Sequence, residues 1–195
     1  MDRQQVLSIF KESGALLDGH FQLTSGLHSN QYFQCAKVLQ YPKYMTALCS
    51  DIAMSFAGRS IDVVIAPAMG GIVVGQEVGR LLGARTMFTE RKESVMQLRR
   101  GFEIRRGERV LVCEDVVTTG GSVFEVMKIV NGLGGAVVGV GFIVDRSGGR
   151  VKFEVAEGGM QHSVLQMDVV TYKPDSCPLC KQGLAVDKPG SRGNK

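Results

Sequence analysis

The chain has 195 residues, of which 44% are hydrophobic and 22% charged, proportions typical of one compact globular domain. No stretch has the roughly eighteen consecutive apolar residues of a membrane span, and the first ten residues lack the layout of a secretion signal, so we expect a cytoplasmic protein with no membrane partner. The formal charge is +4, but the last eight residues carry three of the 23 Lys and Arg and no acid. Without them the charge is +1, so we expect no nucleic-acid partner.

Two amphipathic helices are predicted before the first strand, because apolar residues recur at helical spacing around residues 6–10 and 44–56. From residue 62 onward, short apolar runs alternate with helical segments at about 72–82 and 123–133. Continuous β-branched runs are typical of parallel strands covered on both faces. The fold class predicted is therefore α/β, with a doubly wound, mainly parallel sheet and helices on both faces. The strands expected are 62–66, 86–88, 110–113 and 137–144, with a further strand near 164–172 that closes the domain.

We expect a single domain over residues 1–195, with a small N-terminal hood over about 1–40 and a core over about 41–173. The composition after Pro174 is rich in Pro, Gly, Ser and Lys, which indicates an irregular tail over about 174–195.

The five cysteines are scattered apart from Cys177 and Cys180, which favours reduced thiols over a disulfide framework. The motif CPLC is half of a zinc knuckle, but the sequence shows no second CxxC and no suitable histidine pair. His20, His28 and His162 have no metal-ligand or catalytic-triad spacing. We therefore expect incidental tail thiols and no protein metal centre, with a metal shared between two subunits as the alternative.

A strand that leads into two carboxylates and a glycine-rich turn carries the functional argument. Four apolar residues precede Glu114 and Asp115, and Thr-Thr-Gly-Gly-Ser follows at 118–122 before a helix. Glycines let the backbone approach a ligand, and hydroxyls with the free N–H groups of a helix start suit a phosphate. Carboxylates beside this turn suit ribose hydroxyls, directly or through Mg²⁺. The alternative is an N-capped helix with the two acids as solvated turn residues.

This segment resembles the binding signature for phosphoribosyl pyrophosphate (PRPP) in type I phosphoribosyltransferases, which has two acidic residues before a Thr- and Gly-rich loop. The resemblance implies displacement at the anomeric carbon of PRPP, with Mg²⁺ as cofactor. It assigns Glu114 and Asp115 to the ribose hydroxyls and to catalysis. The metal is held mainly through PRPP, with Asp115 as the one candidate protein ligand. The residues implied around the 5-phosphate are Thr118, Thr119, Gly120, Gly121 and Ser122.

Two further segments are assigned by the same resemblance. The turn after strand 62–66 is implied to bind pyrophosphate through backbone N–H groups, although several relatives have a lysine at Gly70; a tight packing turn is the alternative. The turn consists of Ala68, Met69, Gly70 and Gly71. The long polar stretch 88–109 is a candidate mobile lid that excludes water and supplies cations.

Four basic residues lie in this polar stretch. Arg91 and Lys92 match an Arg-Lys pair that the family donates across a dimer interface, which implies a catalytic role and a homodimer that shares the basic loop. Arg99 and Arg100 are assigned to PRPP on their charge alone. The alternative for all four is a solvated surface cation.

The segment 19–35 indicates the base, because it resembles the hood of orotate phosphoribosyltransferases. An arginine suits a planar carboxylate such as that of orotate. The departures from the family pattern are Thr24, Leu27 and His28, which stand where better-known members have basic residues, although His28 could touch substrate. The residues implied to bind orotate are Ser25, Tyr32, Phe33, Thr118 and Arg146.

The resemblance thus implies formation of orotidine 5′-monophosphate and pyrophosphate from orotate and PRPP, a step of pyrimidine biosynthesis. Two alternatives stay open: a phosphoribosyltransferase for a purine or uracil, and a PRPP-binding regulator without catalysis.

Overall fold

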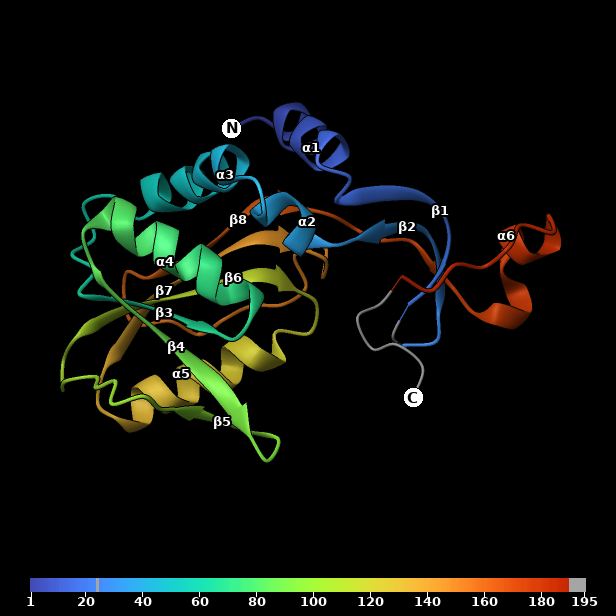
Figure 1. Ribbon diagram of the computed structural model, residues 1–195. Helices are drawn as coiled ribbons and strands as arrows, with labels where there is room; N and C mark the ends of the chain where they lie inside the picture. The colour runs from blue at the N-terminus through green and yellow to red at the C-terminus, as the bar shows by residue number, and fades with distance from the viewer. Residues whose placement is uncertain (24, 190–195) are drawn as a thin grey trace.

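The computed structural model describes residues 1–23 and 25–189, so Thr24 and residues 190–195 lie outside the described residues. Its main element is a six-stranded sheet of order β5-β4-β3-β6-β7-β8 (Figure 1). Neighbouring strands are parallel except for β4 and β5. The strands are β3 (Val63–Pro67), β4 (Arg85–Lys92), β5 (Val95–Leu98), β6 (Arg109–Val117), β7 (Ala136–Asp145) and β8 (Met160–Gln166).

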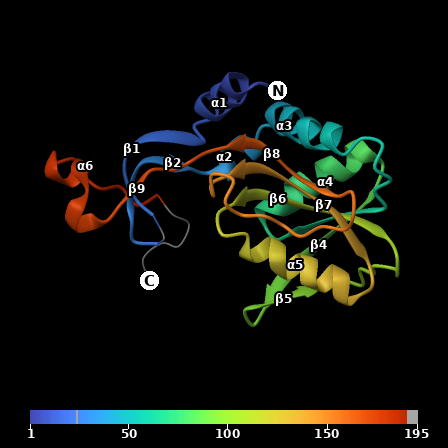
Figure 2. The same ribbon diagram turned by 180° about the vertical axis from the view of Figure 1, so that it is seen from behind.

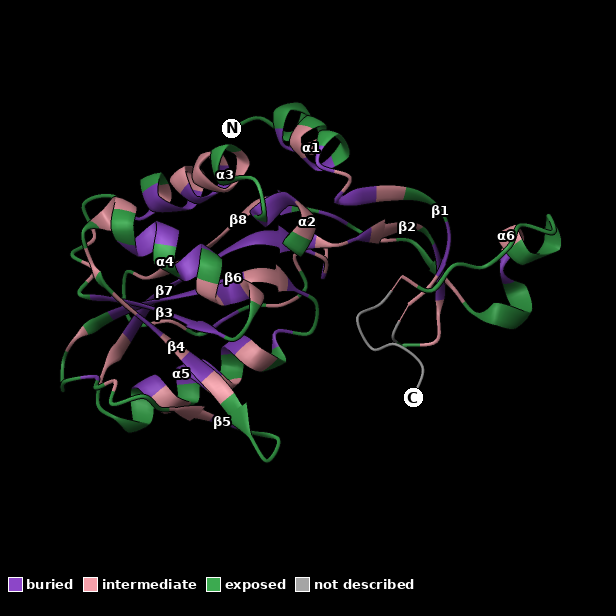
Figure 3. Cartoon of the chain, in the orientation of Figure 1, coloured by how far each residue is buried: buried purple, intermediate pink, exposed green. Residues whose placement is uncertain are grey.

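Helices cover both faces of this sheet, which confirms the predicted α/β fold. Val64 and Ala66 of β3 belong to a core shared with α3 (Pro42–Ser55) and α4 (Gly70–Leu82), whereas Val63 and Ile65 face α5 (Gly121–Gly132). Successive strand residues point to opposite faces, so a strand buried on both sides must be apolar at every position. Figure 3 shows the central strands buried along most of their length.

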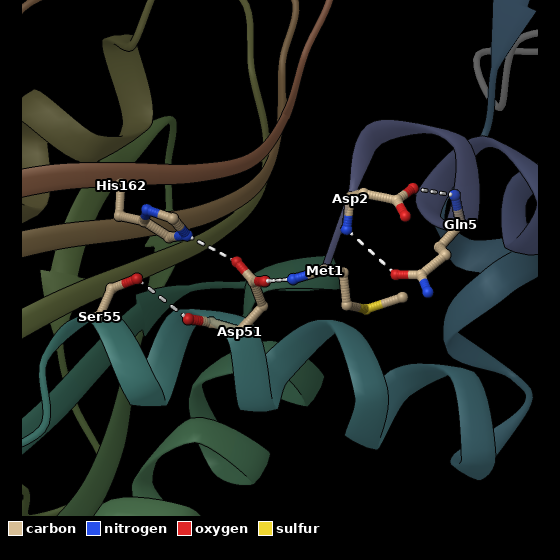
Figure 4. A network of polar contacts seen from close by, with 6 residues as sticks. All are labelled: Met1, Asp2, Gln5, Asp51, Ser55 and His162. Carbon is tan, nitrogen blue, oxygen red and sulfur yellow. Dashed lines mark hydrogen bonds and ion pairs between the residues drawn. The ribbon is translucent and has the colours of Figure 1, made fainter.

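The N-terminal helix α1 (Arg3–Glu12) lies beside α3 and is held by the polar network of Figure 4. Asp2 and Gln5 form a capping box, with Gln5 N donating to Asp2 Oδ1 over 2.8 Å. Asp51 of α3 accepts from the Met1 amino group and lies 2.8 Å from His162 Nε2 of β8. Burial alone would raise the pKa of Asp51, but these two hydrogen bonds outweigh it and lower that pKa.

A second sheet of three strands stands at the end of β6 and β7, and we name it the hood sheet (Figures 1 and 2). It has the order β1-β2-β9 and is joined to α3 by α2. Two short helical turns follow β9 in the tail. The elements are β1 (Leu16–Gln22), β2 (His28–Phe33), α2 (Cys35–Leu39), β9 (Thr171–Tyr172), η1 (Pro174–Ser176) and α6 (Pro178–Lys181).

Two predictions from the sequence are wrong at this level. The strand expected near 164–172 is two strands in different sheets, because the chain leaves the main sheet after Gln166 and pairs again only at β9. The polar stretch 88–109 is not one long loop, because β4 and β5 form an antiparallel hairpin over its first half. The hairpin turns at Glu93 and Ser94, whose φ angles of 51° and 67° match the positive values of a type I′ turn.

Within the described ranges 1–23 and 25–189, no helix is both long and apolar enough to span a bilayer.

Close packing of α3 on β7 generates a test of the fold. A side chain at Gly139 would collide with Phe56, so we expect Gly139→Ala to destabilise the protein by about 1–3 kcal/mol through overpacking. That loss lowers the Tm by about 2–4 °C for each kcal/mol in a chain of this size, as measured by thermal unfolding. The matched control is Gly132→Ala at the end of α5, where nothing lies within 4 Å. Equal Tm values for both variants would contradict this packing.

Candidate active site

The site lies where the chain connections diverge from the middle of the sheet. Strands β3 and β6 are parallel neighbours, and each is followed by a helix at its carboxyl end. The crossover through α4 leads to β4 on one side, whereas the crossover through α5 leads to β7 on the other. A crevice at such a switch point is where α/β sheets bind ligands.

The loop after β6 forms a pocket of about 220 Å³, a candidate for binding an anion. Gly120, with φ of 77°, is the N-cap of α5, and no side chain caps this helix. The alternative of an N-capped helix is therefore wrong, and the first N–H groups of α5 are available to a ligand. Thr118 and Thr119 are exposed at the pocket. The predicted members Thr118, Thr119, Gly120, Gly121 and Ser122 all line it.

The two carboxylates of β6 lie against the turn that precedes α4. A Cβ atom at Gly71 would lie 2.9 Å from Glu114 Oε1, and one at Gly70 would overlap the carboxylate of Asp115. Asp115 N donates to Glu114 Oε1 over 3.0 Å. The structure thus brings together the two segments that the sequence analysis singled out, and it explains why glycine stands at position 70 here.

The start of α4 is a second candidate for binding an anion. Its N-cap, Met69, is 82% exposed and makes no side-chain cap, so the first N–H groups of this helix are also uncapped. Ala68 N donates to Thr89 O over 2.8 Å, which anchors the turn to β4. The acidic pair therefore lies between two uncapped helix starts.

The electrostatics of the pair are dominated by burial. Glu114 is 8% exposed, and burial together with the neighbouring Asp115 carboxylate raises the pKa of Glu114 to about 9. In the ligand-free protein, Glu114 is therefore protonated at neutral pH. The alternative of two solvated turn residues is wrong for Glu114.

Arg146 lies after β7, half-buried beside Tyr32 and Cys35. Its Nε atom is fully buried without a hydrogen-bond partner, and among the described residues no carboxylate pairs with it. Burial lowers the pKa of its guanidinium, although arginine stays cationic at neutral pH. A cation withdrawn from water without a partner indicates an anionic ligand. The alternative of a surface ion pair is wrong for Arg146 among the described residues.

Arg91 lines the pocket of its own chain. Its Nη2 lies 2.7 Å from Glu125 Oε2, and its Nη1 donates to Ser94 O over 2.9 Å. Glu125, on the first turns of α5, was not identified from the sequence, although it follows the Gly121 helix start by four residues. Lys92 ends β4 and is exposed, outside the pocket.

Several predicted site residues lie elsewhere. Phe33 is only 6% exposed and its ring packs 5.4 Å from that of Phe10, because Tyr32 and Phe33 alternate on one strand and only one can face a ligand. Ser25 is exposed in the turn between β1 and β2, apart from the residues of the pocket.

The other misplaced residues carry charge or an imidazole. Arg99 and Arg100 both pair with Glu90, at 3.1 and 2.9 Å, and do not line the pocket. His28, for which contact with substrate was left open, is buried against His20 in the hood sheet.

Comparison with known proteins gives one consistent result from sequence. Residues 38–156 match the family described as "Phosphoribosyl transferase domain". The chain is 59% identical over 194 residues to the orotate phosphoribosyltransferase of Chlorobaculum parvum, covering 100% of this chain and 98% of that protein. It is 54% identical over 192 residues to the orotate phosphoribosyltransferase of Desulforamulus reducens, covering 98% of each.

Solved structures share the fold at lower identity. The orotate phosphoribosyltransferase of Mycobacterium tuberculosis in complex with inorganic phosphate matches with a TM-score of 0.65 and 24% identity, over 84% of this chain and 95% of that one. The adenine phosphoribosyltransferase of Rhodothermus marinus matches with a TM-score of 0.67 and 20% identity, over 84% and 99%. The fold is therefore common to enzymes named for different bases. The high sequence identity over the whole chain is to the orotate enzymes. The chain belongs to the phosphoribosyltransferase family and, within it, to the orotate phosphoribosyltransferases.

Proposed function

We propose that this chain transfers the 5-phosphoribosyl group of PRPP to orotate, giving orotidine 5′-monophosphate and pyrophosphate for pyrimidine biosynthesis. The observation that carries the proposal is the acidic pair of β6 held between two uncapped helix starts. One helix start suits the 5-phosphate, the other suits the pyrophosphate, and carboxyl groups between them suit the ribose hydroxyls.

In the reaction, the bond from the anomeric carbon to pyrophosphate breaks and a bond to a ring nitrogen of orotate forms. Positive charge develops on the ribose ring and negative charge on the leaving group. The residues of the chain act by placing the reactants and by stabilising these charges, with no covalent intermediate on the protein. Arg146 holds the carboxylate of orotate, and Tyr32, which lies beside it, faces the base.

The donor set of the site fits Mg²⁺. Carboxylates are the hard oxygen ligands that this ion prefers, and a cation beside Asp115 would offset the cost of ionising the buried Glu114. We propose that Asp115 holds Mg²⁺ together with PRPP. When bound, the ion neutralises part of the charge of the pyrophosphate.

We further propose a cytoplasmic homodimer in which the β4–β5 hairpin contributes cations to catalysis. Lys92 is exposed at the end of this hairpin and, among the residues that the structure describes, has no acidic partner. Arg91 contacts the pocket of its own chain and becomes available to pyrophosphate when its ion pair with Glu125 opens. Arg99 and Arg100 are left out of the proposed PRPP site, because Glu90 engages both.

The choice of base is tested by activity. With Mg²⁺ and PRPP, we expect loss of the ultraviolet absorbance of orotate and no turnover of adenine, guanine, hypoxanthine or uracil. Turnover of one of those bases in place of orotate would overturn the proposed specificity.

Arg146 tests the orotate site. We expect Arg146→Gln to lower kcat/KM for orotate by at least about 100-fold, because a charge-assisted bidentate contact is lost, with little change in the KM for PRPP. The control is Arg150→Gln, since Arg150 is exposed and its one acidic partner among the described residues is the exposed Asp168. Equal losses for PRPP and orotate would contradict an orotate-specific role.

Asp115 tests the ribose site. Asp115→Asn keeps the shape of the side chain but removes its charge, so we expect turnover to fall about 100-fold or more while the Tm changes by no more than a few degrees. Asp175→Asn in the exposed tail is the control. Wild-type turnover in Asp115→Asn would exclude the proposed role.

A variant of Glu114 tests how much the buried carboxyl group lowers the stability of the folded protein. A carboxyl group whose pKa rises on folding from 4.5 to about 9 contributes stability that is fully present below pH 4.5 and is lost as the pH rises toward 9. In chelator and without ligand, we therefore expect Glu114→Gln to have a higher Tm than wild type at pH 8, and a much smaller difference at pH 5. The variant should be inactive. A Tm difference independent of pH would show that Glu114 is ionised in the folded protein.

A further inference from the structure

Four potential metal ligands converge at the end of the hood, far from the acidic pair in the sequence. They are His20 of β1, His28 of β2, Cys177 at the N-cap of α6 and Cys180 within α6. Their ligand atoms all lie within 4.8 Å of one another. The prediction that the chain lacks a histidine pair for the CPLC motif is therefore wrong. Figures 1 and 2 both show α6 beside the β1–β2 hairpin, away from the main sheet.

Three nitrogen–sulfur separations in the cluster are close to those of a tetrahedral zinc site. Zn–N bonds of about 2.0–2.1 Å and Zn–S bonds of about 2.3 Å place the nitrogen and sulfur ligands of one ion roughly 3.6 Å apart. Cys177 Sγ and Cys180 Sγ lie 3.6 and 3.7 Å from His20 Nε2, and Cys180 Sγ lies 3.3 Å from His28 Nδ1. The two histidine nitrogens are 2.9 Å apart, slightly less than the roughly 3.3 Å expected around an ion.

A hydrogen bond from Nδ1 of His20 to a backbone carbonyl leaves its Nε2 available to a metal. Its Nδ1 lies 2.9 Å from the carbonyl oxygen of Leu184, and because a carbonyl only accepts, Nδ1 carries the hydrogen. The lone pair of the neutral ring is then on Nε2, the atom that faces both thiols. A backbone carbonyl that fixes the tautomer of a histidine is the usual second contact of a metal ligand.

The backbone of the hairpin is adapted to this arrangement. The register of β1 and β2 shifts by one residue between Asp18 and Phe21, so His20 lies in a β-bulge. A bulge re-aims side chains relative to a regular ladder. His20 is 4% exposed and His28 is 6% exposed, which are low values for imidazoles that form no hydrogen bond or ion pair with a carboxylate of residues 1–23 and 25–189.

The tail segment over these residues has no core of its own. Within residues 173–188, Cys177 is the only buried residue, while Leu184 and Val186 are 48% and 45% exposed. The segment nevertheless begins and ends on the hairpin. Thr171 and Tyr172 pair with β2, and Asp187 exchanges hydrogen bonds of 2.8 Å with His20 and Gln22 of β1. Short segments without a core are commonly ordered by a metal or a disulfide.

We propose that His20, His28, Cys177 and Cys180 bind one structural Zn²⁺ per chain, which fixes the C-terminal segment onto the β1–β2 hairpin. Four protein ligands close the coordination sphere, so the ion holds structure and binds no substrate. Two imidazoles and two thiolates in tetrahedral arrangement favour zinc, whereas the oxygen ligands at Asp115 favour Mg²⁺. This site does not depend on the proposed transferase activity.

Metal content tests the proposal directly. Protein purified without a histidine tag should contain about one zinc per chain by elemental analysis. Co²⁺ in place of zinc should give the visible bands of a tetrahedral ion and thiolate charge-transfer absorption. We expect Cys180→Ser and His28→Asn to lose the metal and these bands. The controls Cys49→Ser and His162→Gln change a cysteine and a histidine outside the cluster and should keep both.

Several outcomes would overturn the site. One is wild-type protein that binds neither zinc nor Co²⁺ under reducing conditions. Another is Cys180→Ser that binds the metal as wild type does. A third is a metal-free protein two hydrogens lighter in mass, with Cys177 and Cys180 joined as a disulfide.

Hydrogen exchange tests what the ion does. Removal of zinc by a chelator, without PRPP or orotate, should speed exchange in residues 173–188 and 20–28 and leave residues 110–113 of β6 unchanged. The thiols of Cys177 and Cys180 should react with an alkylating reagent only after chelation. Equal exchange and reactivity before and after zinc loss would exclude a structural role, whatever the activity of the enzyme.

Discussion

The carboxyl groups of Glu114 and Asp115 can lie against the start of α4 only because residues 70 and 71 have no side chains. This close approach joins two segments that are more than forty residues apart in the sequence, and the parallel pairing of β3 and β6 holds it in place. The rest of the site follows from it, since the same strand ends deliver the starts of α4 and α5 to either side of the acids. The sheet fixes the positions of the strand ends, and the residues at and after those ends supply the carboxyl and N–H groups of the site.

The site contains groups whose burial or missing partners oppose folding in the ligand-free protein. Glu114 is buried with a pKa raised to about 9, Arg146 lacks an acidic partner among the described residues, and α4 and α5 begin without side-chain caps. Each feature costs stability in the free protein, and each matches an opposite charge or a hydrogen-bonding group of the proposed reactants. The cores on the two faces of the sheet provide the stability that makes this arrangement possible.

Sequence reasoning identified the parts of the molecule whose pattern is local. Strands β3, β6 and β7 are continuous apolar runs, and the acidic pair adjoins the Thr- and Gly-rich loop 118–122 in the chain, so both were predicted. Strand β5 was missed because it is a short, half-exposed edge strand whose turn, Glu93–Ser94, lacks the usual Asn-Gly signature. Phe33 was misassigned because an aromatic pair on a strand has one member on each face. The histidine and cysteine cluster needs a β-bulge and three segments from opposite ends of the chain, and no spacing in the sequence encodes that meeting.

The hood sheet is assembled from both ends of the chain, since β1 and β2 pair with β9. During synthesis, therefore, the first two strands leave the ribosome long before their third strand exists. Strands β3 to β7 of the large sheet can pair first, because fewer residues separate these strands in the sequence than separate β2 from β9. The hood sheet gains its third strand only after residue 172 has been made, later in synthesis than strands β3 to β7 of the main sheet.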